Sequence, residues 1–283
     1  MNLFMQESST RMRMKINSTL FNIPIINSVI EYDCTDSTNI KAKEFSKRGS
    51  VHGTLFLAHK QLNGKGRLNR TFDSKKDEGI YASLLLRPNV SPNQLPNITL
   101  LTAVAIVRAL KTICHLTPLI KWPNDILLNG KKLAGILTEA GPDYVIVGIG
   151  LNTTTKSFSS DIEKTATSIF LETGKTIDSF DLLYNIMEEF NDLYEQFIIH
   201  SDFSFLLEEY NNNLANLNQE VHIIPHDISC SVSNPYSIKI ENLDSFLCRG
   251  IDATGALLCE GPDKKITIIN SGEVSLRGKN SYS

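Results

Sequence analysis

Apolar residues recur at helical spacing in two long segments of the chain. Residues 95–116 and residues 180–217 both place apolar side chains at intervals of three or four positions, so each segment is predicted to be a helix. A third, shorter helix is expected over residues 33–49. Ser37 can cap its start, and Gly49 stands where a left-handed residue would end it.

Four further segments read as strands because they are short, apolar and bounded by turn residues. Asn129 and Gly130 separate two apolar runs, which predicts a hairpin over residues 120–139. The other expected strands are residues 54–58, 79–86 and 144–151. Together these elements predict an α+β fold with a mixed, largely antiparallel sheet and the helices on one side of it.

The pattern changes near residue 219. Short alternating runs follow, separated by turn residues, at residues 221–224, 236–240, 256–259 and 265–269. We therefore expect two domains: a larger one over residues 1–218, in which residues 1–28 are a candidate for poor order, and a small all-β barrel over residues 219–283.

Composition narrows the class of protein. A net charge of −3 on 283 residues gives no general attraction for nucleic acid or membrane, so any anion site must be local. The five cysteines include no Cys-x-x-Cys pair, which favours reduced thiols and a cytoplasmic location.

No secretory signal precedes the first helix, although the basic N-terminus leaves organelle targeting open as an alternative to poor order. The longest uncharged apolar stretch, residues 98–107, is too short to span a bilayer.

A basic, glycine-containing loop follows the strand over residues 54–58. Gln61 opens it, and Gly64, Lys65, Gly66, Arg67 and Arg70 follow. Glycine lets backbone N–H groups approach a ligand closely, and the three cations suit an anion. The loop matches neither a P-loop nor a dinucleotide-binding motif, and a solvated hairpin tip is the alternative interpretation.

Three other groups of residues indicate a site. Lys121 stands beside the only tryptophan of the chain, in an apolar strand. If its amine is buried, it requires an anionic partner; the alternative is a lysine that lies along the sheet surface with its amine in water.

Glycines inside the expected strands, at Gly135, Gly148 and Gly150, suggest a flat trough for a ring system. At the start of the first helix, Ser37, Thr38 and Asn39 provide either ordinary caps or contacts to a small polar group. Asn152 could add an amide at the rim of the trough.

Taken in order along the chain, these motifs resemble those of the biotin–protein ligases, the biotin–acetyl-CoA-carboxylase ligases. The resemblance runs from about residue 30 to the C-terminus. It rests on Ser37-Thr38-Asn39, the loop from Gln61 to Ser74, Lys121-Trp122-Pro123-Asn124-Asp125, Lys132 to Glu139, Gly148-x-Gly150-x-Asn152, residues 250–258 and residues 271–277.

The resemblance implies a fold, a reaction and a set of partners. The fold is a catalytic domain like that of class II synthetases and biotinyl/lipoyl ligases, followed by a small SH3-like barrel. The reaction uses ATP and biotin as substrates, with Mg²⁺ accompanying ATP through unidentified ligands, to form biotinyl-5′-AMP. Biotin then passes to a lysine of a biotin carboxyl carrier protein.

The resemblance also assigns roles to residues. Lys121 and Arg67 are the implied catalytic residues. The implied biotin-binding residues are Ser37, Thr38, Asn39, Gln61, Lys65, Gly66, Arg67, Lys121 and Gly135. The implied ATP- and adenylate-binding residues are Gly64, Lys65, Arg67, Arg70, Lys132 and Asn152.

The chain also departs from the family pattern. Lys65, Asn69 and Phe72 replace the usual arginine, glycine and tryptophan of the loop, which puts affinity rather than reaction type in question. Only 36 residues precede Ser37, so we expect a single-function ligase that binds no DNA and no membrane; a homodimer remains open. A lipoate–protein ligase or octanoyl transferase, and a non-catalytic biotin-binding protein, are the alternatives.

Overall fold

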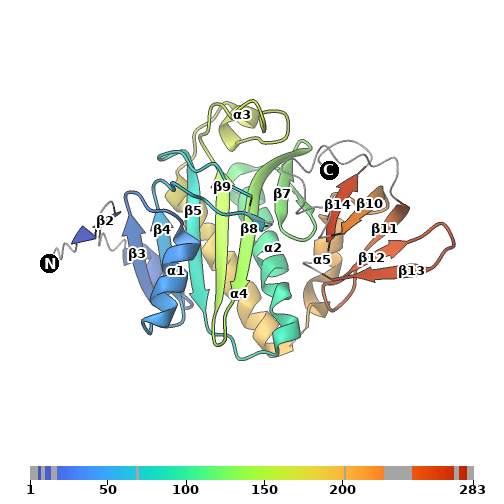
Figure 1. Cartoon of the computed structure of the whole chain (residues 1–283), viewed down its shortest axis with the longest axis horizontal. Helices are drawn as coiled ribbons and strands as arrows, with labels where there is room; N and C mark the ends of the chain where they lie inside the picture. The colour runs from blue at the N-terminus through green and yellow to red at the C-terminus, as the bar shows by residue number, and fades with distance from the viewer. Residues whose placement is uncertain are drawn as a thin grey trace.

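The computed structural model of the chain consists of a large sheet flanked by helices and a smaller sheet beside it (Figure 1). It describes residues 6–7, 10–13, 18–67, 70–200, 202–225, 244–270 and 274–278.

The large sheet has nine strands in the order β1-β2-β3-β4-β5-β9-β8-β7-β6. β3 and β4 run parallel, and the other neighbouring strands pair antiparallel. The predicted α+β class with a mixed, largely antiparallel sheet is therefore confirmed. The strands are β1 (Gln6–Glu7), β2 (Thr10–Arg13), β3 (Ser28–Tyr32), β4 (Thr54–Ala58), β5 (Gly79–Leu86), β6 (Leu119–Lys121), β7 (Asp125–Leu128), β8 (Lys131–Ala140) and β9 (Val145–Asn152).

Helices cover both faces of this sheet, so the expectation of helices on one side is wrong. Along β5, Ile80, Ala82 and Leu84 belong to the same core as α2 (Pro96–Cys114) and α4 (Ser179–His200). The alternate residues Tyr81 and Leu85 lie in a second core with Ala42 of α1 (Thr38–Lys47). Figure 1 shows α1 in front of the sheet and α2 and α4 behind it. The nearly continuous apolar run of β5 was the available signal, because a strand that is buried on both faces loses the alternation of apolar and polar residues.

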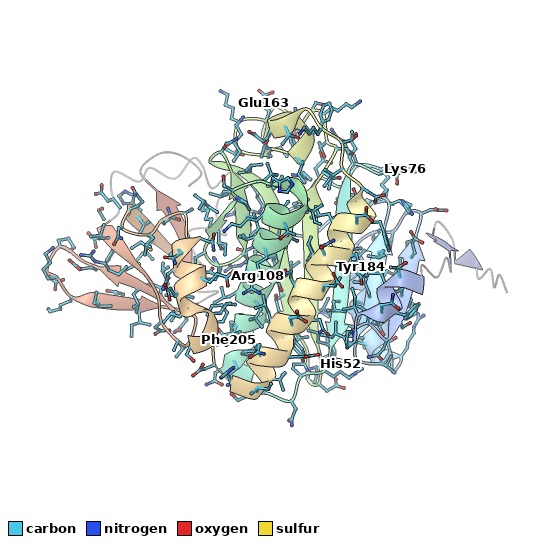
Figure 2. The ribbon with its side chains drawn as sticks, turned by 180° about the vertical axis from the view of Figure 1, so that it is seen from behind. His52, Lys76, Arg108, Glu163, Tyr184 and Phe205 are labelled. Carbon is cyan, nitrogen blue, oxygen red and sulfur yellow. The ribbon has the colours of Figure 1, made fainter. Side chains whose placement is uncertain are left out.

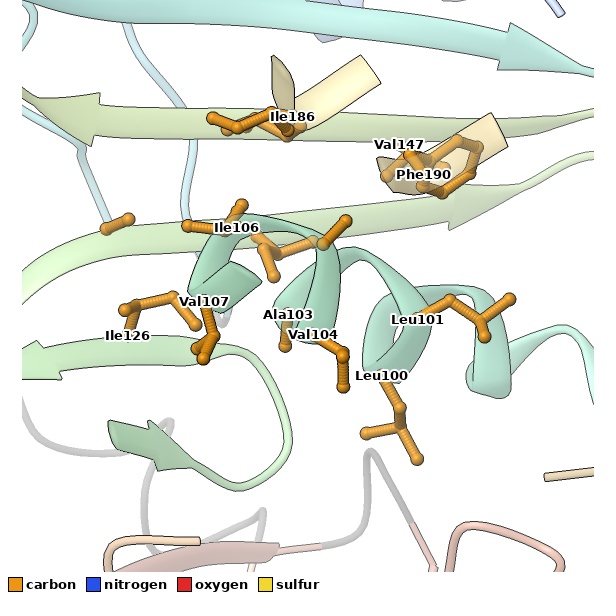
Figure 3. Packing of buried hydrophobic residues seen from close by; sticks show 14 of the residues in the cluster. Leu100, Leu101, Ala103, Val104, Ile106, Val107, Ile126, Val147, Ile186 and Phe190 are labelled. Carbon is orange, nitrogen blue, oxygen red and sulfur yellow. The ribbon is translucent and has the colours of Figure 1, made fainter. Parts of the chain in front are cut away.

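α2 forms the centre of the main core. Its side chains from Ile98 to Val107 are buried on every side of the helix, because it lies between the sheet and α4. Figure 3 shows Val107 of α2 close to Ile126 of β7, and Ile186 and Phe190 of α4 on the opposite side of the helix. The segment Pro92–Cys114 is long and apolar enough to cross a membrane, but 72% of its most apolar window is buried within the protein. This segment is a core helix.

The residues before β3 also contribute to the core. Leu20, Ile23 and Ile26 are at most 3% exposed and pack in the main cluster, next to the 3-10 turn η1 (Ser18–Asn22). This segment is therefore part of the folded core.

The predicted hairpin over residues 120–139 is correct in its turn and wrong in its first strand. Asn129 and Gly130 both have positive φ and join β7 to β8, as a type I′ turn requires. The first half, however, is two short strands, β6 and β7, which pair antiparallel with each other. The chain reverses direction at Trp122-Pro123-Asn124, where the Trp122–Pro123 peptide bond is cis. The Lys121-to-Asp125 motif is therefore a turn.

The long helix predicted over residues 180–217 is also interrupted. α4 ends at His200, and the 3-10 turn η4 (Ser204–Leu206) leads into the short helix α5 (Leu207–Asn212). The apolar spacing is similar in α4 and α5, so periodicity alone did not reveal the break. A short helix missed by the sequence, α3 (Ile169–Thr173), is capped by the Ser168 side chain, which accepts a hydrogen bond from the Leu171 N–H at 3.0 Å.

The C-terminal part is a five-stranded antiparallel sheet in the order β13-β12-β11-β10-β14. Among the residues described, β13 and β14 have no pairing that would close a barrel, so the predicted SH3-like barrel is not shown. The expected strand over residues 236–240 lies outside the described residues, and β11 and β14 were not predicted. The strands are β10 (Glu220–Pro225), β11 (Ser245–Ile251), β12 (Leu257–Glu260), β13 (Ile266–Ile269) and β14 (Val274–Gly278).

A charged network joins the helices on the far side of α2. Arg108 of α2, labelled in Figure 2, donates to both carboxylate oxygens of Glu209 in α5 at 2.8 and 2.6 Å, and to Glu189 of α4 at 3.2 Å. Hydrogen bonds from Arg108 lower the pKa of the Glu209 carboxyl. This bidentate pair fixes α5, and with it the chain that leads to the C-terminal sheet.

We expect Glu209→Gln to lower the free energy of unfolding by about 1 kcal/mol at pH 7, a value reduced for the solvent exposure of the pair. A carboxyl whose pKa is lowered by folding stabilises the protein above its unfolded pKa, and this contribution is lost as the pH falls through the folded pKa. The difference between the variant and the parent chain should therefore disappear in acid. Urea unfolding from pH 7 to pH 3 measures it, with the exposed neighbour Glu208→Gln as control. Equal effects of the two substitutions at pH 7 would contradict the role of the pair.

Candidate functional site

Three glycines lie next to one another on the face of the sheet beneath α1. Gly135 of β8 is the register partner of Gly150 of β9, and Gly148 lies two residues along the same strand. A Cβ at Gly148 would lie 2.1 Å from Asn39 Oδ1, and one at Gly150 would lie 2.8 Å from the Phe72 ring. The missing side chains therefore let Asn39 and Phe72 lie directly against the strands.

A cavity of about 40 Å³ opens over these glycines. Its wall joins α1, the basic loop, the turn between β6 and β7, and the strands β5, β8 and β9. Predicted site residues that line it are Thr38, Asn39, Lys65, Gly66, Arg67, Lys132 and Gly135; Phe72, Asn124, Gly148 and Gly150 line it as well. The structure thus brings together residues from across more than a hundred positions of the chain.

Gln61 links the start of α1 to the basic loop. Its side-chain oxygen accepts hydrogen bonds from the Thr38 N–H at 2.8 Å and the Thr38 hydroxyl at 3.2 Å. Its amide nitrogen donates to Ser74 Oγ at 2.9 Å. Ser37 is the N-cap residue of α1 and is 2% exposed, but its side chain makes no capping hydrogen bond. The helix start is therefore organised by Gln61 rather than by Ser37.

Ser83 lies below these residues and was missed at the sequence level. It is fully buried, and its Oγ lies 2.7 Å from Thr38 Oγ1 and 2.6 Å from Asn39 Oδ1. Asn39 donates in turn to the Leu137 carbonyl at 3.2 Å and to Glu139 Oε2 at 2.9 Å. A serine inside the apolar run of β5 was the available signal, because a buried hydroxyl requires partners.

Arg67 is a half-buried cation in the wall of the cavity. Its Nη1 donates to Asn124 Oδ1 at 3.1 Å. Burial lowers the pKa of the Arg67 guanidinium, Asp125 opposes that effect, and Arg70 adds to it. A cation that has lost part of its water gains most from an anion placed beside it.

The basic loop is held as a small hairpin. The Gly66 N–H donates to the Arg70 carbonyl at 2.7 Å, and the Phe72 N–H donates to the Gly64 carbonyl at 2.8 Å. A Cβ at Gly64 would lie 2.4 Å from the Phe72 carbonyl oxygen. Arg70 is exposed and does not line the cavity. Asn69 lies outside the described residues.

Lys132 and Lys121 approach the site from β8 and β6. Lys132 Nζ lies 2.6 Å from Asp125 Oδ1. Asp125 is the register partner of both Lys121 and Gly135, and residues directly opposite in antiparallel strands share a face. Lys121, which is 7% exposed, is therefore on the α1 face of the sheet, although it does not line the cavity itself. Its predicted role rests on this placement.

Asn152 lies away from the cavity. Its amide donates to the Thr167 carbonyl at 3.0 Å and so ties the end of β9 to the residues before α3. Its contact with a nucleotide stays a prediction.

A larger groove of about 670 Å³ adjoins the cavity and shares Arg67, Asn124 and Ile136 with it. It lies between the start of α2 and the β8–β9 turn. Volume alone favours the groove as a binding site. We place the chemistry in the smaller cavity, because the cations and the hydrogen-bonded side chains converge there. The described residues contain no group of three or more His, Cys, Asp or Glu side chains that could hold a metal ion.

Two family models match the chain. Residues 31–152 match the Biotin/lipoate A/B protein ligase family, and residues 247–277 match the Biotin protein ligase C terminal domain. The first match contains the predicted site residues from Ser37 to Asn152.

Individual biotin–protein ligases are similar to this chain in sequence. The chain is 37% identical over 179 residues to the bifunctional ligase/repressor BirA of Bacillus spizizenii, covering 61% of this chain and 55% of that protein. It is 36% identical over 160 residues to the biotin–[acetyl-CoA-carboxylase] ligase of Paracoccus denitrificans, covering 53% of this chain and 65% of that protein. The chain thus spans about half the length of the Bacillus relative.

Among solved structures, the biotin protein ligase of Aquifex aeolicus in complex with biotin and ATP matches with a TM-score of 0.77 and 28% identity. The match covers 89% of this chain and all of the Aquifex chain.

We expect Ser83→Ala to lower the free energy of unfolding by about 1–3 kcal/mol, because it leaves Thr38 Oγ1 and Asn39 Oδ1 buried with one partner fewer. Ser46→Ala, at a buried serine near the end of α1 whose hydroxyl donates to the Lys43 carbonyl, is the matched control. Urea unfolding of both variants measures the difference. Equal stability of the two would show that the Ser83 network does not organise the site.

Proposed function

Because this chain belongs to the Biotin/lipoate A/B protein ligase family, we propose that it is an ATP-dependent biotin–protein ligase. The observation that carries the proposal is one cavity whose wall has two chemistries. Its lining includes both Thr38, which is hydrogen-bonded to Gln61, and the cations Lys65, Arg67 and Lys132. A neutral polar ring with an acidic tail, activated by a nucleotide, fits such a division.

In the proposed first step, a carboxylate oxygen of biotin attacks the α-phosphorus of ATP. The bond from that phosphorus to the pyrophosphate oxygen breaks, which gives biotinyl-5′-AMP and pyrophosphate. Both reactants are anions, so the protein must bring cations to them rather than supply a nucleophile. We assign this role to Lys121 and Arg67. Mg²⁺ would accompany ATP as part of that substrate and would neutralise part of the charge on its phosphates.

In the second step, a lysine amine of the acceptor attacks the acyl carbon of the adenylate. The bond to AMP breaks, and the amine loses a proton as the amide forms. The basic loop would shield the mixed anhydride from water until then.

The other site residues would bind the two substrates. We assign phosphate contacts to Lys65, Arg67, Arg70 and Lys132. We assign contacts with the ureido ring of biotin to Ser37, Thr38 and Gln61. Gly64 and Gly66 would allow the loop to approach the ligand. Gly135 would let the ring lie against the sheet, Asn39 would support that side of the pocket, and Asn152 would stand near the nucleotide.

A lipoate ligase is the second candidate from the same family. The match of residues 247–277 to the C-terminal domain of biotin protein ligases favours biotin. The deciding experiment measures ATP–pyrophosphate exchange with biotin or lipoate as the acid, followed by transfer to a biotin carboxyl carrier protein. Exchange with lipoate alone would overturn the proposal, and binding of biotin without any exchange would favour a non-catalytic binding protein. That the chain binds no operator DNA and acts in the cytoplasm remain predictions.

We expect Lys121→Ala to reduce biotin-dependent pyrophosphate exchange by about 100-fold or more, the size seen when one preorganised charge-stabilising donor is removed. Biotin binding, measured by calorimetry, should stay detectable, because Lys121 does not line the cavity over the glycines. Lys131→Ala, at an exposed lysine of the β7–β8 hairpin, is the control and should exchange at the parent rate. Near-normal exchange by Lys121→Ala would remove this residue from the mechanism.

The adjoining groove offers the acceptor a way to the site, because it shares Arg67 and Asn124 with the cavity. We expect Ala140→Trp, which fills the groove at the end of β8, to lower transfer to the carrier protein about 10-fold while pyrophosphate exchange is unchanged. Ile199→Trp, on the exposed surface of α4, should change neither step. A single-turnover transfer assay with preformed adenylate measures the effect. Equal transfer by both variants would place the acceptor elsewhere.

A further inference from the structure

Two polar side chains of α1 line the cavity, Thr38 and Asn39. Asn39 Oδ1 lies directly against the sheet, because a Cβ at Gly148 would be only 2.1 Å from it, and Gly148 lines the cavity as well. Thr38 and Asn39 are at most 4% exposed. Because water hardly reaches them, what they can offer a ligand depends on which of their protons the protein already uses.

The Asn39 amide has no N–H left for a ligand. Its two N–H groups donate to the Leu137 carbonyl at 3.2 Å and to Glu139 Oε2 at 2.9 Å. A backbone carbonyl can only accept, so the amide nitrogen must point to Leu137 and Oδ1 must point the other way, towards Ser83. Asn39 therefore presents an oxygen, which is an acceptor, at the glycine face of the sheet.

Ser83 extends this constraint to Thr38. Its Oγ lies 2.6 Å from Asn39 Oδ1, and only the Ser83 proton can occupy that contact. The same Oγ lies 2.7 Å from Thr38 Oγ1, so it can accept the Thr38 proton there. Gln61 Oε1 also accepts from the Thr38 hydroxyl, at 3.2 Å. In either arrangement the Thr38 proton stays within the protein, and the hydroxyl can meet a ligand only through a lone pair.

We propose that Ser83 is a specificity-determining residue, because it leaves Thr38 and Asn39 without a spare donor and so selects a ring that carries N–H groups. The ureido ring of biotin supplies such donors. The dithiolane ring of lipoate, whose ring atoms are carbon and sulfur, supplies none. Ser83 acts through its two partners, since it is fully buried and does not line the cavity itself. The inference rests on the proposed ligase function and adds the chemical group by which the site would recognise its acid.

Such a wall should reject a ring of the same shape that lacks the donor. A ring oxygen placed against Thr38 Oγ1 or Asn39 Oδ1 would bring two acceptors together where water hardly reaches, and neither would have a hydrogen-bond partner. A site built to bind an N–H group therefore discriminates more strongly than an apolar pocket does. The matched probes are the two cyclic carbamates of biotin, in each of which a ring oxygen replaces one of the ureido N–H groups.

We expect the parent chain to bind biotin at least about 30-fold more tightly than the less favoured carbamate, the size of a buried acceptor left unpaired. Ser83→Ala removes the donor to Asn39 and frees the Thr38 proton to turn to a ring oxygen. Biotin binding should then weaken about 3- to 10-fold, and the ratio of the carbamate and biotin dissociation constants should fall to about one-tenth of the parent ratio. Isothermal titration calorimetry of the full chain without ATP measures both constants.

Two further variants separate selection of the ligand from general stability. Ser46→Ala removes another buried hydroxyl of α1, which donates to the Lys43 carbonyl at 2.9 Å, and should leave both dissociation constants unchanged. Ser83→Cys keeps a group of similar shape whose S–H is a weak donor, so the ratio should fall in the same direction as in Ser83→Ala. If Ser83→Ala does not fold, the cysteine substitution decides the question.

A parent chain that does not bind biotin would overturn the ligase function and this inference with it. A parent chain that binds biotin would overturn the inference alone if it bound both carbamates equally tightly. The same conclusion would follow if Ser83→Ala weakened biotin and the less favoured carbamate by one common factor, because a purely structural role of Ser83 gives that result.

Discussion

Burial of the large sheet on both faces is the constraint on which the rest of the structure depends. The strands β5, β8 and β9 must present large apolar side chains to α2 and α4 on one face, and this requirement builds the main core. On the other face the same strands meet the short helix α1 and the basic loop, so small and polar residues can stand there. Ser83, Gly135, Gly148 and Gly150 occupy that face, and they create room where Asn39 and Phe72 approach the backbone. The candidate site thus lies on the face of the sheet that points away from the main core.

The sequence predicted the elements whose limits are set by local chemistry. β5 runs from Gly79 to Leu86 as expected, because a glycine and Pro88 bound one apolar run. The β7–β8 turn was equally clear, since Asn129 and Gly130 adopt positive φ readily. The errors arose where tertiary contacts decide the outcome. The break at Trp122–Pro123 interrupts a run that reads as one strand, and α4 and α5 share one apolar spacing although a 3-10 turn separates them. No local signal shows that α1 crosses to the opposite face from α2.

The candidate site was more predictable than the fold around it, because cations and glycines in short motifs are visible without knowing the packing. Arg67, Lys132 and Gly135, chosen from motifs far apart in the chain, line one cavity. Residues that act through others were not visible in this way. Ser83 reads as one polar residue in an apolar strand, and the Gly255 carbonyl that receives the Trp122 N–H has no side-chain signature at all. Sequence motifs thus revealed groups that could meet a ligand, and only the structure reveals the groups that hold them.

The size of the cavity carries a consequence for how a substrate would enter. The cavity is small, at about 40 Å³, against about 670 Å³ for the adjoining groove. The Phe72 ring lies against Gly150, in the place a flat ligand would take on the trough. The backbone bonds between Gly64 and Phe72 and between Gly66 and Arg70 keep the loop as a unit. A ligand that displaces Phe72 must therefore either turn its ring or shift the hairpin that carries Lys65 and Arg67. In the second case, binding of the ring and placement of the two cations would be one motion, which gives a physical reason for aromatic and basic residues to share one short loop.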